Sequence, residues 1–434
     1  MRRFPLKRTV NKTTRMGCQP ILNIAMVWLL ARTLVLLIAT PGQLMAENWD
    51  ASDNPARLAD RLEIRINNLP QNGQSRYIPW AGPCWETFRD SINTRWAGTS
   101  SDSAATKYGE AFGVSGVADA VSENYGIDRY KSSRTNCTQN SECDSSLGEA
   151  CAKRTAQSAG VCIPTWWGIC HAWAPVSIDL PEPKIPVEYN AVRFQVSDIK
   201  ALLSVSYTRA SARIAGERCD EDAPALDDHG RPESSECRST NAGTWHVILS
   251  NIVGLDGKSF IMDQRRDGRR SSYPIWRYRT TRLEQVTLQD AMRLVADDLP
   301  GTAARYLFNA TAVSFYHVET AVDYIVPSPP GRDGFLGGVI DEFTRTTTLD
   351  YILEVDADDR IIGGEYIGAS KTSHPDFMWK ATGRGNADAA GGRIRADDVM
   401  HVYALSTGQA QQATPWWIAV LLALPLLGWW CRRR

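Results

Sequence analysis

The sequence lacks an excess of charge of one sign, since 48 Lys and Arg residues face 49 Asp and Glu residues over 434 positions. Apolar residues are not scarce, and a hydrophobic content of 43% excludes a disordered or fibrous protein. The charge balance conceals a basic stretch, residues 1–46, with seven Lys or Arg, and three arginines at the C-terminus. Without these ten, 38 basic residues face 49 acidic ones, so we expect no nucleic-acid partner.

Two long hydrophobic runs lie near the ends of the chain. Residues 20–46 follow a basic stretch and end at the small residue Ala46, which is typical of a cleaved secretory signal; an uncleaved membrane anchor is the alternative. Residues 415–431 carry paired tryptophans at both edges and precede three arginines, so they predict a short membrane anchor or a sorting tail that is removed after export. We therefore expect residues 47–414 to face an oxidising periplasm, cell surface or exterior, with membrane contact through a terminal segment.

The cysteine-rich stretch Cys137–Cys162 lacks the C-x2-C pairs and nearby histidines of a zinc site, which leaves zinc as the weaker alternative. Its four cysteines fall within 26 residues that hold almost no large apolar side chains. Because such a stretch cannot build its own core, we expect a small insert with two disulfides, whose connectivity is open among three pairings. An acidic loop between Cys219 and Cys237 predicts a third disulfide.

Two further cysteines remain in the expected exported chain. Cys84 has apolar neighbours, so we expect a buried and unreactive thiol. Cys170 lies among tryptophans, and a leftover thiol in an oxidising compartment is a candidate nucleophile. We expect Cys170 to begin a helix, where the helix dipole favours a thiolate, although Pro175 limits the length of that helix. A disulfide between Cys84 and Cys170, which would leave no thiol, is the alternative.

Apolar spacing predicts helices first and an antiparallel sheet afterwards, hence an α+β fold with N-terminal helices. Helices are expected at 54–68, at 104–112, at 198–207 after a capping Ser197, and at 288–299 after a capping Thr287. Strands are expected within 308–326, 349–355 and 361–367. No repeat of about 20 to 50 residues interrupts this order.

A hairpin is predicted from two β-rich stretches, 244–253 and 259–263, which a Gly-containing turn separates. The hairpin would carry His246 on one strand and Asp263 at the end of the other. These two residues would be about three positions out of register, so their side chains could meet if a bulge or twist closes the gap. Together with the Cys170 thiol, an imidazole and an acid that orients it form the set that thiolate acyl chemistry needs. The plainer alternatives are a core histidine and an aspartate that ends a strand.

Four stretches resemble the transglutaminase elicitor family of protein-glutamine γ-glutamyltransferases. They are 78–98, 166–175, 243–263 and 361–379, and they include long Trp-containing strings. The resemblance implies an α+β fold with a papain-like or transglutaminase-like core, with Cys170 as nucleophile, His246 as base and Asp263 as orienting acid. A protein glutamine would acylate the cysteine, and a lysine amine would then attack the thioester to give an isopeptide bond.

Four tryptophans are candidates for a dry, substrate-binding approach to this thioester, with core packing as the alternative for each: Trp166, Trp167, Trp173 and Trp245. No cofactor is expected. The aspartate-rich turn 356–359 lacks a full calcium-loop pattern, so calcium dependence stays open without an assigned site. A cysteine hydrolase with the same triad, either a peptidase or a glutamine deamidase, is one alternative function, and a non-catalytic surface binding protein is another.

The sequence thus predicts six parts. They are a signal peptide (1–46), the N-terminal helical part of the catalytic region (47–135), a disulfide-rich insert (136–163), a catalytic core with the Cys-His-Asp set (164–300), a C-terminal antiparallel β region (301–400) and a hydrophobic anchor or sorting tail (415–434).

Overall fold

The computed structural model describes residues 49, 51–221, 223–228, 231–238, 240–264, 271–296, 305–382 and 386–408. All of them belong to one unit, Asn48–Arg434. The predicted signal peptide, 1–46, and the predicted C-terminal segment, 415–434, lie outside the described residues. No helix in the described ranges has the length and apolar character needed to cross a membrane.

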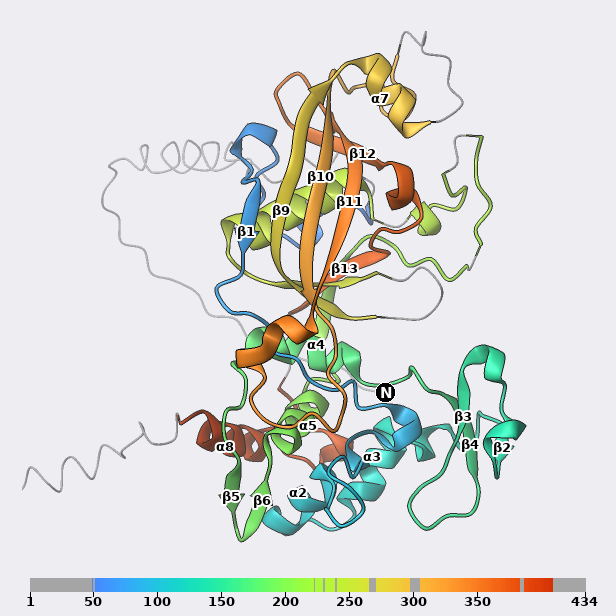
Figure 1. The fold of residues 1–434 in the computed structure, drawn as a ribbon, viewed down its shortest axis with the longest axis vertical. Helices are drawn as coiled ribbons and strands as arrows, with labels where there is room; N and C mark the ends of the chain where they lie inside the picture. The colour runs from blue at the N-terminus through green and yellow to red at the C-terminus, as the bar shows by residue number, and fades with distance from the viewer. Residues whose placement is uncertain are drawn as a thin grey trace, which may run out of the picture. The chain divides into compact units, whose positions relative to one another are not determined.

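Helices that are far apart in the sequence pack together below the sheet in Figure 1. They are α2 (Ala104–Phe112), α3 (Val117–Tyr125), α4 (Cys170–Asp179), α5 (Val196–Ser206) and α8 (Ala396–Thr407), joined by a hairpin of β5 (Val187–Tyr189) and β6 (Val192–Phe194). The Ser103 hydroxyl caps α2 by accepting a hydrogen bond from Thr106 N–H, and this helix confirms the prediction for 104–112. The predicted helix at 198–207 is also confirmed, but α5 begins two residues earlier and its cap is Gln195; the predicted cap, Ser197, lies inside the helix.

The helix predicted at 54–68 is wrong. Two short 3-10 turns form there instead, Pro55–Arg57 and Ile66–Asn68. Leu58, Ala59, Ile64 and Ile66 of this segment are buried along an irregular path at the edge of the sheet, where the carbonyl of Ile64 accepts a hydrogen bond of 2.9 Å from Ile361 N–H. Tertiary hydrogen bonds thus satisfy backbone groups that a helix would have paired internally.

An eight-stranded sheet, in which the strands of the described residues pair antiparallel, forms the rest of the main body. Its path is β12-β11-β10-β9-β8-β13-β7, with β1 paired to β9 beside this path. The strands are β1 (Asn72–Gln74), β7 (Ser211–Ala215), β8 (Phe260–Asp263), β9 (Tyr273–Val286), β10 (Ser314–Ile325), β11 (Thr344–Val355), β12 (Ile361–Tyr366) and β13 (Phe377–Thr382). β10, β11 and β12 confirm the three predicted strands. Helix α7 (Leu288–Val295) begins at its predicted cap, Thr287, and packs against β10 and β11.

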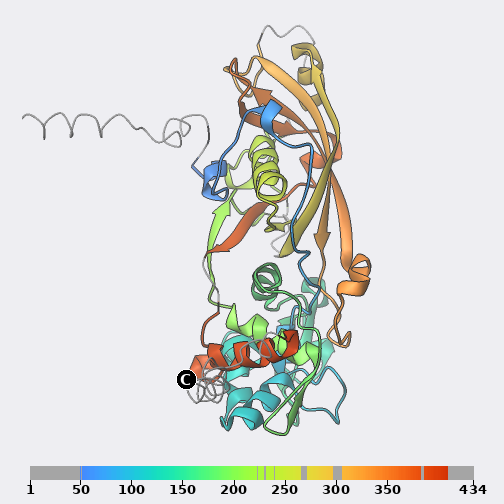
Figure 2. The same cartoon turned by 90° about the vertical axis from the view of Figure 1, so that its left-hand side faces the viewer.

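The first strand of the predicted 244–263 hairpin is wrong, because this segment is a helix. Helix α6 (Ala242–Leu249) continues into a π-helical turn, Ser250–Leu255, and covers one face of the sheet (Figures 1 and 2). Every residue of α6 is buried, so the helix has no polar face, and an apolar run of this kind cannot be distinguished from a strand by its periodicity. The local signal for the helix is Asn241, whose side chain accepts hydrogen bonds from the first-turn N–H groups of Gly243 and Thr244.

The disulfide-rich insert forms a small sheet of its own. It contains β2 (Asn136–Cys137), β3 (Glu149–Ala152) and β4 (Gly160–Pro164), in the order β2-β4-β3. Of the three open connectivities, the one observed pairs Cys137 with Cys151 and Cys143 with Cys162. The zinc alternative is wrong, because all four sulfur atoms are in disulfides. The third predicted disulfide, Cys219–Cys237, is confirmed.

Candidate active site

Cys170 is the first residue of α4, as the sequence predicts, and the helix runs past Pro175 to a total of ten residues. The turn before Cys170 is held against a second segment, since Ile169 N–H donates a 2.7 Å hydrogen bond to the Cys84 carbonyl. Gly168 leaves room for this approach, because a Cβ there would lie 2.6 Å from the same oxygen. Helix α4 also contacts β8 and β9, so the cysteine lies where the helices meet the sheet (Figure 1).

Cys84 and Cys170 are both free, so the alternative in which they form a disulfide is not observed. A hydrogen bond between the two sulfur groups is the main cause that lowers the pKa of Cys170. The Ser272 hydroxyl and the His171 backbone N–H lower this pKa further, whereas burial and the Asp263 carboxylate oppose them. The same sulfur contact, together with burial, raises the pKa of Cys84 well above its usual value. Cys84 is therefore the S–H donor and Cys170 is the sulfur that carries charge.

Asp263 is the predicted site residue that the fold brings to Cys170. It ends β8, is only 1% exposed, and its charge acts on the Cys170 sulfur. Its Oδ1 atom accepts hydrogen bonds from the Ser271 hydroxyl at 2.8 Å and from the Ser271 N–H at 3.1 Å. These bonds fix the carboxylate on the short segment that also delivers Ser272 to the sulfur.

His246 is not brought to this site. It lies on α6, is 4% exposed, and its Nδ1 atom is 2.8 Å from the Tyr351 hydroxyl on β11. That hydroxyl also bonds Thr320 on β10 at 2.8 Å. Burial lowers the pKa of His246 to about 4, so the ring is neutral at physiological pH. Among the described residues its ring contacts Tyr351 and not Cys170, because the helix directs the imidazole toward the middle of the sheet.

A cavity of about 590 Å³ opens beside Cys170. Its polar lining includes His171, Arg218 and Ser272. Its apolar lining comes from four regions of the chain, around residues 130, 166–167, 207–214 and 377–379, and includes Tyr130, Trp166, Trp167, Phe377 and Trp379. An aromatic cavity that ends at an ionisable thiol is suited to hold the apolar stem and amide of a side chain against the sulfur.

The four predicted substrate-binding tryptophans divide into two groups. Trp166, which is 38% exposed, and Trp167 line the cavity. Trp173 and Trp245 are completely buried in the core, where Trp173 donates its ring N–H to the Trp80 carbonyl at 3.2 Å. Core packing, the alternative considered for each tryptophan, is therefore what the structure shows for the second pair.

The sequence did not identify three residues that lie near the sulfur. Ser272 comes shortly after the basic sequence 264–270, and no local sequence pattern marks it. Trp379 ends one of the four resembling stretches, which is the one signal that pointed to it. Cys84 was predicted to be inert, with a disulfide to Cys170 as the alternative; a free Cys84 that donates to the Cys170 sulfur across 86 positions depends on the tertiary fold.

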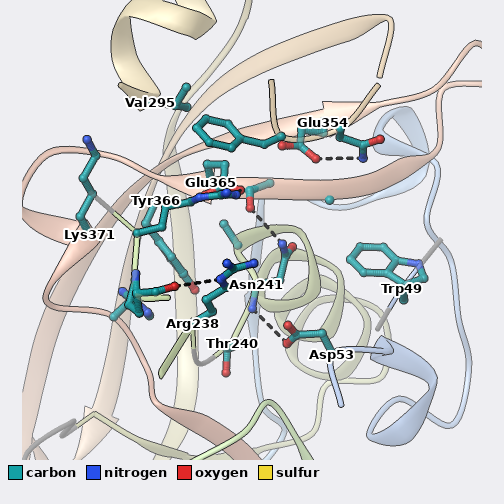
Figure 3. Close-up of a pocket in the computed structure, with 18 of the residues that line it drawn as sticks. Trp49, Asp53, Arg238, Thr240, Asn241, Val295, Glu354, Glu365, Tyr366 and Lys371 are labelled. Carbon is teal, nitrogen blue, oxygen red and sulfur yellow. Dashed lines mark hydrogen bonds and ion pairs between the residues drawn. The ribbon is translucent and has the colours of Figure 1, made fainter. Parts of the chain in front are cut away.

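A second, polar cavity of about 380 Å³ lies between α6 and β12 (Figure 3). Asn241 donates two hydrogen bonds across it, from its backbone N–H to the Asp53 carboxylate at 3.0 Å and from its side-chain amide to the Gly364 carbonyl at 3.1 Å. Burial and the nearby Glu365 charge raise the pKa of Glu354 to about 8. This cavity has no cysteine among its described lining residues, so the candidate thiol site is the cavity at Cys170.

Comparisons with known proteins agree with this arrangement. A family model described as transglutaminase elicitor matches residues 55–402, which contain Cys170 and Asp263. The crystal structure of the GP42 transglutaminase from Phytophthora sojae is similar, with a TM-score of 0.68 and 32% sequence identity; the match covers 80% of this chain and 94% of that chain. No curated protein matches. The predicted fold, an α+β transglutaminase-like core with a disulfide-rich insert, is confirmed by this likeness and by the observed disulfides.

Proposed function

The chain belongs to the transglutaminase elicitor family, and we propose on this premise that it transfers acyl groups from protein glutamine side chains to lysine or other primary amines. The observation that carries the proposal is the environment of Cys170. This sulfur lies at a helix N-terminus, has a lowered pKa and faces an aromatic cavity. A thiolate with these properties is an activated nucleophile.

The first half of the proposed reaction is attack of the Cys170 thiolate on the carboxamide carbon of glutamine. A thioester forms as the C–N bond breaks, and the departing nitrogen needs a proton to leave as ammonia. We assign this proton transfer to Asp263, in place of the predicted His246, because its carboxylate is the acid that interacts with the sulfur. The thiol proton passes to the carboxylate and then to the leaving nitrogen, so one proton is shared by the pair.

The second half is attack of a primary amine on the thioester, which forms the isopeptide bond and restores the thiolate. Asp263 accepts the proton that the amine loses. Water competes at this step, so aminolysis needs a cavity with few waters. The aromatic walls around Cys170, among them Trp166, Trp167 and Trp379, support this requirement. The proposed chemistry uses no cofactor, since the sulfur and the carboxylate supply both functions.

The protein partners in this proposal are proteins that expose Gln and Lys side chains. We further propose that the chain works outside the cytoplasm, in the periplasm, on the cell surface or in the exterior. The support is the presence of three disulfides, which persist in oxidising compartments. The proposed membrane contact through a terminal segment rests on the sequence alone.

Incubation of the purified protein with casein and a labelled primary amine tests the proposal. The wild type should attach the label to casein, whereas Cys170→Ala and the nearly isosteric Cys170→Ser should not. Ser177→Ala is a matched control on the same helix, because the Ser177 hydroxyl donates a 2.7 Å hydrogen bond to the Ala174 carbonyl within that helix and does not line the cavity. Release of ammonia or peptide without label would identify a hydrolase, and a folded protein with neither reaction would identify a binding protein.

A further inference from the structure

The described part of the chain holds eight cysteines, of which six form three disulfides and two are free. The two free thiols are not isolated, because the Cys84 and Cys170 sulfur groups share a hydrogen bond. Two thiols within hydrogen-bonding reach of each other have the composition of a reduced disulfide, in which the two bonded sulfurs would lie about 2 Å apart.

Two backbone hydrogen bonds hold the segment that begins at Cys84 against the segment that precedes Cys170. Ile169 N–H donates to the Cys84 carbonyl at 2.7 Å, and Thr87 N–H donates to the Trp167 carbonyl at 2.8 Å, so residues 84–87 run beside residues 167–169. Between them Trp85 is fully buried and has a φ of 50°, a left-handed conformation that bulky residues rarely adopt. A strained backbone of this kind persists only where the surrounding structure fixes it, and such strain is concentrated at functional sites. The strain at Trp85 therefore favours a functional role for its neighbour, Cys84.

We propose that Cys84 is the resolving cysteine for Cys170, and that the two close a reversible disulfide that switches off the acyl-transfer site. The inference rests on the proposed function in one respect, namely that Cys170 is the nucleophile. The oxidant is a low-molecular-weight disulfide of the type that glutathione forms. In an oxidising compartment this reaction competes with acylation by glutamine.

The exchange proceeds in two balanced steps. The Cys170 thiolate attacks one sulfur of the external disulfide, a mixed disulfide forms, and one external thiolate leaves. Cys84 then loses its proton, and its thiolate attacks the Cys170 sulfur and expels the second external thiolate. The two protein thiols are oxidised by two electrons in total, and the external disulfide is reduced to two thiols.

The structure assigns the order of these steps. Cys170 lines the cavity, so an external disulfide reaches it, whereas Cys84 is not among the described lining residues. Cys170 also has the lowered pKa and Cys84 the raised one, so Cys170 is the attacking thiolate. The closed disulfide removes the nucleophile but protects it from irreversible oxidation to sulfinic acid, and reduction restores it.

Peptide mapping by mass spectrometry tests the proposal directly. The full exported protein is treated with oxidised glutathione, its remaining thiols are alkylated, and it is digested without reduction. We expect a linked peptide pair that contains Cys84 and Cys170, the loss of amine incorporation, and recovery of both thiols and activity on reduction. In Cys84→Ser, which keeps a hydrogen-bond donor, the same treatment should leave glutathione on Cys170 and form no linked pair.

If Cys84→Ser fails to fold, the peptide map of the oxidised wild-type protein is sufficient to test the proposed disulfide. A wild-type protein that retains glutathione on Cys170, with Cys84 still alkylated, would overturn the proposal. Amine incorporation by the reduced protein is measured in parallel. Its absence would contradict the proposed function, whereas the linked peptides would still establish the disulfide, so the two failures are distinguishable.

Discussion

At the scale of single residues, the site depends on how one negative charge is shared between Cys170 and Asp263. Hydrogen bonds from Cys84 and Ser272 favour the thiolate, while the carboxylate disfavours it. In the reaction that we propose, these opposing effects keep the proton within the pair and available to the leaving nitrogen. The sequence pointed to both members of the pair, from a leftover thiol after a glycine-containing turn and from an aspartate that ends a strand. It gave no sign of Cys84 and Ser272 as donors, since both contacts are long-range.

Asp263→Asn separates the two effects of this carboxylate. Without the negative charge the pKa of Cys170 should fall, so alkylation by iodoacetamide should reach its midpoint at a lower pH than in the wild type. Amine incorporation should nevertheless decrease by about 10²–10⁴-fold, because the proton carrier is lost. The asparagine oxygen still accepts the hydrogen bonds from Ser271. An unchanged alkylation profile with full turnover would contradict the assignment and leave His171 as the proton carrier in the cavity.

At the scale of elements, α6 shows where sequence patterns are insufficient. Strands β10–β12 alternate and helices α2 and α7 have caps, so local signals predict them. Helix α6 is buried on every side, and its period is hidden because no polar face exists to reveal it. The incorrect strand prediction placed His246 on a hairpin beside Asp263, whereas α6 places it against Tyr351 on β11. Only the packing of α6 on the sheet decides between these two positions.

The burial of His246 within α6 makes stability depend on pH. Its pKa is about 4 in the folded protein, below the ordinary value of 6.5, so the unfolded chain binds the proton more readily. The stabilisation is therefore present above pH 6.5 and decreases as the pH falls toward 4. The contribution of His246 to the free energy of unfolding should fall by about 2 kcal/mol between pH 7 and pH 5.

Urea unfolding of the wild type and His246→Gln at these two pH values measures the effect. The variant should be less stable at pH 7 by about 1–3 kcal/mol, because the Tyr351 hydrogen bond is perturbed, and its stability should change less with pH. Per folded molecule, its amine incorporation should match that of the wild type. If His246→Gln instead lost as much turnover as is expected for Asp263→Asn, without loss of stability, His246 would have a role in the reaction.

At the scale of the whole molecule, the site joins parts of the chain that local patterns cannot connect. The nucleophile that we propose, Cys170, comes from α4, the carboxylate of Asp263 comes from the end of β8, and the aromatic walls come from segments as distant as Trp166 and Trp379. Pairing of β13 with β8, which sets Phe377 opposite Asp263, closes this arrangement. The resemblance predicted the fold class and the nucleophile, because long Trp-containing strings carry family information. The assembly of the cavity follows from strand order, which no single stretch specifies.

The central claim is that glutamine acylates Cys170, and mass spectrometry of the acyl-enzyme tests it most directly. The reduced protein is mixed with a glutamine peptide in the absence of any amine and quenched in acid. The account predicts a peptide adduct on Cys170 that lacks the elements of ammonia, that is absent from Cys170→Ala, and that a primary amine discharges. An adduct on another residue, or label incorporation that proceeds with Cys170 replaced, would contradict it.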